Sequence, residues 1–179
     1  MRPASAEGRP CLALCGMMGS GKSTVARILA RLTGLPLAST DARVEATARK
    51  PIARIFAEEG EPAFRSLERR AVGSLRGPAV VDLGGGAFCE APSAERLLRL
   101  GSVVFLDVSF AEAARRIGAS AGRPLLADWQ GLLKLRLPLY RRASLRVEVD
   151  RLSAEAVANR ILGALRRDLA GRDRSRGMP

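Results

Sequence analysis

The sequence contains no histidine, only three cysteines and few aromatic residues. Without an imidazole to form or assist one, the sequence implies no covalent intermediate. Aromatic residues make up 4% of the chain, so the stacking platforms that bind single-stranded nucleic acids are scarce. Cys11, Cys15 and Cys89 have neither the number nor the spacing of a metal knuckle or a disulfide framework. We interpret Cys11 and Cys15 as small buried apolar residues.

Long hydrophobic runs are also missing. No run approaches the roughly 20 residues needed to span a bilayer, and residues 1–8 lack the apolar centre of a secretory signal. We therefore expect a cytoplasmic protein without a membrane partner. The 179 residues, 47% of them hydrophobic, suffice for a single domain over 1–179. We expect its core at about 11–165 and frayed polar tails at 1–9 and 168–179.

Lysine is scarce among the basic residues. The net charge is +12, yet only Lys22, Lys50 and Lys134 of the 30 basic residues are lysines. The arginines are scattered among alanines and leucines rather than gathered in one patch, so we expect no nucleic-acid partner. The positive charge suits an enzyme with two anionic ligands, because it raises their local concentration.

A glycine-rich segment carries the strongest motif. Residues 16–24 read GMMGSGKST, follow the apolar run 11–15 and precede a helical pattern. In this Gly-x4-Gly-Lys-Ser spacing, backbone N–H groups surround nucleotide phosphates, Lys22 reaches the β- and γ-phosphates, and the Ser23 hydroxyl ligates Mg²⁺. A glycine turn that only joins a strand to a helix needs neither side chain. We therefore predict a nucleoside triphosphate site with these residues: Gly19, Ser20, Gly21, Lys22, Ser23 and Thr24.

Apolar strand candidates alternate with helical patterns along the chain. The candidates are residues 11–15, 35–38, 79–83, 103–108 and 145–149. This alternation predicts an α/β fold of three layers, α/β/α, around a five-stranded parallel sheet. Two segments interrupt it. We expect a helical cap at 41–76, broken near Gly60-Glu61-Pro62, and a mobile lid at about 118–130, where small residues surround one arginine.

The chain resembles the shikimate kinases in a series of segments that spans residue 11 to about 165. The segments are residues 16–24, Thr40-Asp41 with Glu45, Ile55-Phe56, Gly60-Glu61, Phe64-Arg65-Ser66-Leu67-Glu68, Gly84-Gly85-Gly86-Ala87, Arg123-Pro124-Leu125-Leu126 and Arg136-Leu137-Pro138-Leu139-Tyr140. Many metabolite kinases share the first segment. The Phe-Arg-x-x-Glu, triple-glycine and Arg-x-Pro-Leu-Tyr segments are much more particular to this family.

The resemblance implies transfer of the ATP γ-phosphoryl group to the 3-hydroxyl of shikimate, in aromatic amino-acid biosynthesis. Arg65 and Arg136 match the positions that bind the shikimate carboxylate, a role that suits planar, permanently charged guanidinium groups. Asp41 matches the carboxylate that orients the acceptor hydroxyl and is a candidate to take its proton. The backbone of Gly85 and Gly86 is expected to approach the substrate closely.

The resemblance also assigns two arginines to the nucleotide. Arg123 matches the lid arginine that closes over the phosphates and stabilises the charge on the transferring group. Arg116 matches the arginine that stacks on adenine. The implied catalytic residues are therefore Lys22, Asp41 and Arg123. Glu68 follows Arg65 by three residues on a predicted helix and is expected to hold it.

The segment after the second predicted strand departs from the family. Most shikimate kinases have Asp-x-Asp there, and the first carboxylate helps to hold hydrated Mg²⁺, whereas this chain has Ser39-Thr40-Asp41. Asp82 ends the third predicted strand and is a candidate replacement, acting on Mg²⁺ through a water. The alternative is that Asp82 pairs with a nearby basic residue.

Two other functions remain open. A related metabolite kinase, such as one for gluconate, would share the phosphate loop but not the substrate. A non-catalytic nucleotide-binding regulator is suggested by Ser39. We expect a monomer, packing roles for Trp129 and Tyr140, and a solvated acidic cluster without catalytic function at Glu58, Glu59 and Glu61.

Overall fold

The computed structural model describes residues 11–118 and 128–176, with side chains up to residue 168. Within these ranges, five parallel strands form one sheet in the order β2-β3-β1-β4-β5. The strands are β1 Cys11–Cys15, β2 Leu37–Ser39, β3 Val80–Asp82, β4 Gly101–Asp107 and β5 Leu145–Glu148. Each lies within about two residues of a predicted strand, so the prediction of a five-stranded parallel sheet is confirmed.

The central strand β1 is buried along its whole length. It pairs with β3 on one side and β4 on the other, with Leu14 opposite Asp82 and Val104. A strand covered on both faces reads as an unbroken apolar run, as the segment CLALC does. Cys11 and Cys15 are buried free thiols, as the sequence predicted. This central position fixes where the loop after β1 begins.

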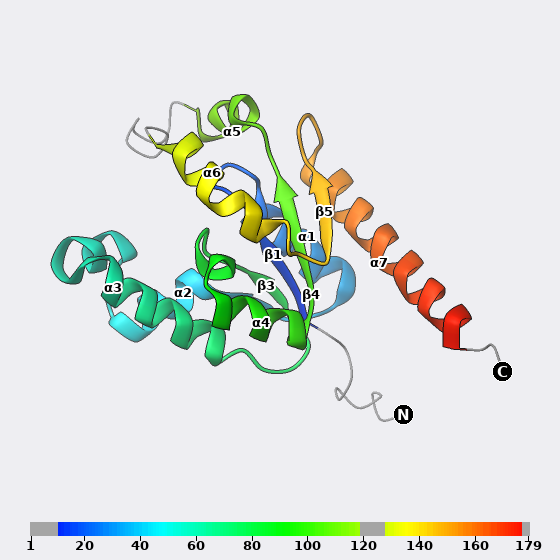
Figure 1. Cartoon of the computed structure of the whole chain (residues 1–179), viewed down its shortest axis with the longest axis horizontal. Coiled ribbons are helices and arrows are strands. Elements are labelled where there is room, and N and C mark those ends of the chain that lie inside the picture. Colours follow the sequence, from blue (N-terminus) through cyan, green and yellow to red (C-terminus); the bar gives the residue numbers. More distant parts are fainter. Residues whose placement is uncertain (1–10, 119–127, 177–179) are drawn as a thin grey trace.

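Helices cover both faces of the sheet, which confirms the three-layer architecture (Figure 1). α1 (Lys22–Thr33) and α7 (Ala154–Arg176) pack together on one face. α4 (Ala91–Leu100), α5 (Phe110–Ile117), α6 (Trp129–Tyr140) and the 3-10 turn η1 (Ala87–Cys89) belong to the connections on the other side. This division follows from right-handed crossovers, because only the β1–β2 connection runs toward the β2 edge.

A helical cap stands beside the sheet, in the place predicted for residues 41–76. α2 (Thr40–Ala48) packs on α3 (Ile52–Gly73), and they share a small core of their own. α3 changes direction at Gly60, where φ is 79° and ψ is 176°. This confirms the predicted break. Only glycine adopts that backbone conformation without strain.

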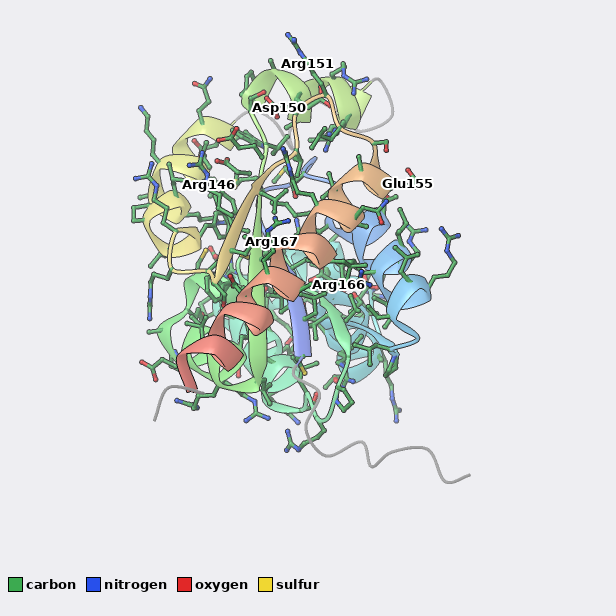
Figure 2. The ribbon with its side chains drawn as sticks, turned by 90° about the vertical axis from the view of Figure 1, so that its right-hand side faces the viewer. Arg146, Asp150, Arg151, Glu155, Arg166 and Arg167 are labelled. Carbon is green, nitrogen blue, oxygen red and sulfur yellow. The ribbon has the colours of Figure 1, made fainter. Side chains whose placement is uncertain are left out.

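The C-terminal segment differs from the sequence prediction. Residues 168–176 are helical and continue α7, whereas the sequence favoured a frayed tail at 168–179. Val157, Ala158 and Ile161 are buried and pack the first two turns of α7 against the core. The alanine-, leucine- and arginine-rich residues that follow extend it at little cost. Figure 2 looks onto this face, where α7 crosses in front of the sheet and carries Arg166 and Arg167.

The predicted lid and the predicted N-terminal tail fall mostly on residues that the structure does not describe. Residues 119–127, the main part of the predicted lid, lie outside the described residues, as do residues 1–9 of the predicted N-terminal tail. Trp129, near the end of the predicted lid range, is the first residue of α6 and is buried. None of the helices in residues 11–118 and 128–176 has the length and apolar character that crossing a membrane requires.

We predict that Gly60→Ala destabilises the protein by about 1–3 kcal/mol, because alanine is strained at this positive φ. Gly73→Ala is the matched control. Gly73 ends the same helix, has no positive φ and leaves open space for a methyl group, so alanine should stabilise the protein by about 0.4–1 kcal/mol. Urea unfolding of both variants measures the two effects, and equal shifts in the same direction would contradict the assignment.

Candidate functional site

The loop between β1 and α1 lines a cavity of about 540 Å³. Gly19 and Gly21 have φ values of 81° and 88°, which glycine tolerates and other residues rarely adopt. A side chain at Gly19 would also come within 2.9 Å of Ala113 of α5. The cavity contains every predicted phosphate-binding residue: Gly19, Ser20, Gly21, Lys22, Ser23 and Thr24. The backbone N–H groups of this loop and the N-terminus of α1, which is the positive end of the helix dipole, make this cavity suited to an anion.

Lys22 lies between this cavity and a second one, and it lines both. Its Nζ donates hydrogen bonds to the carbonyl oxygens of Gly16 at 2.9 Å and Met17 at 3.1 Å. Burial lowers the pKa of Lys22, while the nearby carboxylates of Asp82 and Asp41 oppose that shift. The ammonium group is thus held against the loop, next to both cavities.

The second cavity has a volume of about 300 Å³ and gathers residues from five segments of the chain. The predicted substrate and metal residues all line it: Ser23, Asp41, Arg65, Asp82, Gly85, Gly86 and Arg136. Phe56 and Phe64 add an apolar wall, with ring centroids 4.6 Å apart. Tertiary structure therefore brings together the residues that the sequence analysis selected one by one. The cavity combines guanidinium groups, carboxylates and aromatic carbon.

Arg65 is held by two acidic residues of its own helix. Its Nη1 donates to Glu68 at 2.7 Å, the contact that the sequence predicted, and its Nη2 donates to Glu61 at 2.8 Å. Glu68 is only 2% exposed. Glu61 lines neither cavity and its side chain is 63% exposed, so it fits the predicted solvated cluster although it pairs with Arg65. Glu58 and Glu59 pair with Lys50 near the surface and fit the same prediction.

Two buried carboxylate oxygens face the glycine loop after β3. Among the described residues, neither Asp41 Oδ1 nor Glu68 Oε1 has a hydrogen-bond partner. A side chain at Gly84 would clash with both atoms. A buried carboxylate oxygen without a donor is costly, so a ligand hydroxyl that supplies one gains affinity. Burial raises the pKa of Asp41, the Asp82 charge raises it further, and Lys22 opposes both.

Buried hydrogen bonds that the sequence analysis missed fix the loop of Gly84 and Gly85. The Gly84 N–H donates to Thr40 Oγ1 at 2.8 Å, and the Tyr140 hydroxyl donates to the Gly85 carbonyl. Ser39 caps α2 by accepting from the Ala42 N–H at 3.3 Å. From the sequence, a threonine at the start of a helix suggests only a local cap. Nothing in the sequence therefore indicated that Thr40 bonds to Gly84, 44 residues away.

Asp82 lies at the end of β3, in register with Ser39 of β2. Within the described part of the chain no salt bridge includes it, but its charge acts on the nearby Lys22, so the alternative of a basic partner stays open. Among those same residues no cluster of three or more acidic, histidine or cysteine side chains forms a ready metal cage. Mg²⁺ needs no such cage, because it keeps waters and binds through one or two protein oxygens plus phosphate. Ser23 and Asp82 in one cavity fit that requirement.

Arg116 lines the larger cavity and is held by its neighbours. It donates to Glu112 at 2.8 Å, to the Ser20 carbonyl at 3.1 Å and to the Val149 carbonyl at 2.6 Å. It therefore joins the phosphate loop to the connection between β5 and α7, which lies beside α5 (Figure 2). The predicted stacking on adenine stays a prediction. Arg123 lies outside the described residues.

Comparison with known proteins gives one consistent family. The family model for shikimate kinase matches residues 18–166. The chain is 41% identical over 174 residues to the shikimate kinase of Saccharopolyspora erythraea, covering 92% of this chain and 99% of the relative. It is 41% identical over 167 residues to the shikimate kinase of Rhodococcus jostii, covering 87% and 98%.

Solved structures agree with this similarity. Shikimate kinase from Acinetobacter baumannii in complex with shikimate superposes with a TM-score of 0.84 at 34% identity, over 90% of this chain and 96% of that one. A gluconokinase from Sinorhizobium meliloti superposes with a TM-score of 0.60 at 20% identity, over 94% and 98%. The second likeness concerns the fold alone.

We predict that Glu112→Gln lowers stability at neutral pH and that this loss shrinks in acid. Hydrogen bonds from Arg115 and then Arg116 lower the pKa of Glu112 from 4.5 to about 2, although burial acts to raise it. The stabilisation is therefore complete above pH 4.5 and is lost as the pH falls toward 2. Urea unfolding at pH 7 and pH 3.5 measures it. Glu95→Gln, whose pair with Arg99 is exposed, is the control and should show no comparable pH dependence.

Proposed function

The chain belongs to the shikimate kinase family of P-loop phosphotransferases, and we propose that it transfers the γ-phosphoryl group of ATP to the 3-hydroxyl of shikimate. The products would be shikimate 3-phosphate and ADP, in aromatic amino-acid biosynthesis. One observation carries the proposal: two guanidinium groups converge beside the phosphate loop with two carboxylate oxygens that have no hydrogen-bond partner among the described residues. That set matches a small ring that carries one carboxylate and several hydroxyls.

The acceptor would be bound at both ends of its ring. Arg65 and Arg136 supply paired N–H donors for the carboxylate. Asp41 Oδ1 and Glu68 Oε1 accept hydrogen bonds from hydroxyl groups, which removes the cost of leaving these oxygens unpartnered. Phe56 packs on ring carbon from the apolar wall. Held this way, the nucleophilic hydroxyl faces the phosphate loop, and Asp41 orients it and takes its proton.

The donor side would work by position and charge. The phosphate loop and the start of α1 surround the phosphates, and Lys22 neutralises charge that spreads over the transferring group. Ser23 and Asp82 are the residues that would hold Mg²⁺, which would further neutralise phosphate charge when bound. Arg123 is the proposed lid arginine and Arg116 the proposed adenine contact. No covalent enzyme intermediate is needed.

The direct test mixes the purified chain with ATP, Mg²⁺ and shikimate and follows the 3-phosphate by mass spectrometry. We expect the phosphorylated product with shikimate and far less with quinate or gluconate. Preference for gluconate would overturn the substrate assignment. ATP binding without transfer to any of the three acids would support the non-catalytic regulator that Ser39 raised in the sequence analysis.

We predict that Arg136→Met raises the KM for shikimate at least about tenfold, because a charge-assisted hydrogen bond contributes about 1.5–3 kcal/mol. The KM for ATP should stay within about twofold, since Arg136 lines only the smaller cavity. Arg142→Met is the matched control. It removes an exposed arginine six positions on, which lines neither cavity, and should leave both constants unchanged. An equal effect of the two substitutions would exclude the carboxylate contact.

We predict that Asp82→Asn weakens Mg²⁺ binding to the ADP complex, measured by calorimetric titration. The parallel register sets Ser39 beside Asp82, so a carboxylate at either position lies on the same edge of the sheet. Adding Ser39→Asp to Asp82→Asn should therefore restore much of the lost Mg²⁺ affinity. Unchanged affinity in Asp82→Asn alone removes Asp82 from the metal site.

A further inference from the structure

α6 is attached at its two ends to the two loops that line the cavities. At its first residue, the Trp129 indole N–H donates to the Met18 carbonyl of the phosphate loop at 3.2 Å. At its last residue, the Tyr140 hydroxyl donates to the Gly85 carbonyl of the glycine loop. Arg136 lies between these anchors and lines the smaller cavity. The helix runs between α5 and η1, across the same side of the sheet (Figure 1).

The anchor at Met18 sets the orientation of one peptide group. In a trans peptide unit the C=O and the N–H point in opposite directions. Because the Met18 carbonyl points toward Trp129, the N–H of Gly19 points away from α6. Gly19 lines the larger cavity, so this N–H is one of the donors available to a phosphate. Arg116 holds the Ser20 carbonyl in the same manner.

Trp129 has little freedom to move. Its side chain is 1% exposed, and its ring packs against Phe110 of α5 with centroids 5.5 Å apart. A buried indole N–H without its acceptor would be costly, so the hydrogen bond to Met18 persists as long as α6 keeps its place. A shift of α6 therefore moves the peptide group between Met18 and Gly19.

We propose that Trp129 is a positioning residue: it fixes the phosphate loop in its anion-binding conformation and ties that loop to the helix that carries Arg136. The second part rests on the proposed function, because it assigns Arg136 to the acceptor. Trp129 touches neither reactant in this scheme. It acts through the Met18–Gly19 peptide group, so its loss affects the nucleotide side before the acceptor side.

Trp129→Phe tests the proposal, since it keeps an aromatic ring and removes the N–H donor. We expect ADP affinity and kcat to fall about two- to tenfold, the range that the loss of one neutral hydrogen bond gives. The KM for shikimate should stay within about twofold. Leu132→Ala is the matched control: Leu132 lies on α6, packs on the main core and lines neither cavity. It should lower thermal stability without lowering ADP affinity.

Tyr140→Phe provides the opposite pattern. It removes the donor to Gly85, so it should raise the KM for shikimate and leave ADP affinity unchanged. The proposal is overturned if Trp129→Phe lowers thermal stability but keeps the ADP affinity of the unmodified chain, or if Leu132→Ala reduces ADP affinity equally. ADP binding is measured by calorimetry without shikimate. A chain that fails to phosphorylate shikimate would therefore refute the proposed function and still decide the role of Trp129.

Discussion

Parallel pairing between β1 and β3 is the constraint on which the site depends. Leu12, Ala13 and Leu14 lie opposite Val80, Val81 and Asp82, so both strands end at the same edge of the sheet. The chain reverses after each strand through a glycine-rich loop. One loop surrounds the larger cavity and the other borders the smaller one. Ligands of open α/β sheets bind at this carboxyl edge, where neighbouring strands lead to opposite faces. The strand pairing alone therefore places the larger and the smaller cavity next to each other.

The charged groups in and around the smaller cavity pair with one another, which offsets part of the free-energy cost of burying them. Arg65 is bonded to Glu61 and Glu68, while Lys22 offsets the carboxylates of Asp41 and Asp82. Buried charges without partners cost several kcal/mol each, so most of these groups hold one another in place. The compensation is incomplete at Asp41 Oδ1 and Glu68 Oε1. Preorganised acceptors of this kind favour a ligand that brings hydroxyl donors, and folding has already fixed their geometry.

Much of the site could be predicted because its residues lie in short segments with a local meaning. The Gly-x4-Gly-Lys-Ser spacing, the strand–helix alternation and the Arg65–Glu68 pair all act over a few residues. The missed contacts join distant segments: Thr40 with Gly84, Tyr140 with Gly85, and Arg116 with Ser20. A side-chain hydroxyl or guanidinium group can form hydrogen bonds with many different partners. Which partner it meets depends on the packing of whole helices.

The sequence by itself determined the fold class, the phosphate loop and the identity of the charged groups. The fold class and the phosphate loop follow from the periods of helix and strand and from the backbone freedom of glycine, which are local properties. The charged groups of the site were identified by the resemblance to family segments. Only the tertiary structure decided that Glu68 and Asp41, among the described residues, each keep an oxygen without a hydrogen-bond partner beside Gly84, and that α6 joins two loops. Burial and hydrogen-bond partners depend on which distant surfaces pack together, and close packing fixes that for the molecule as a whole.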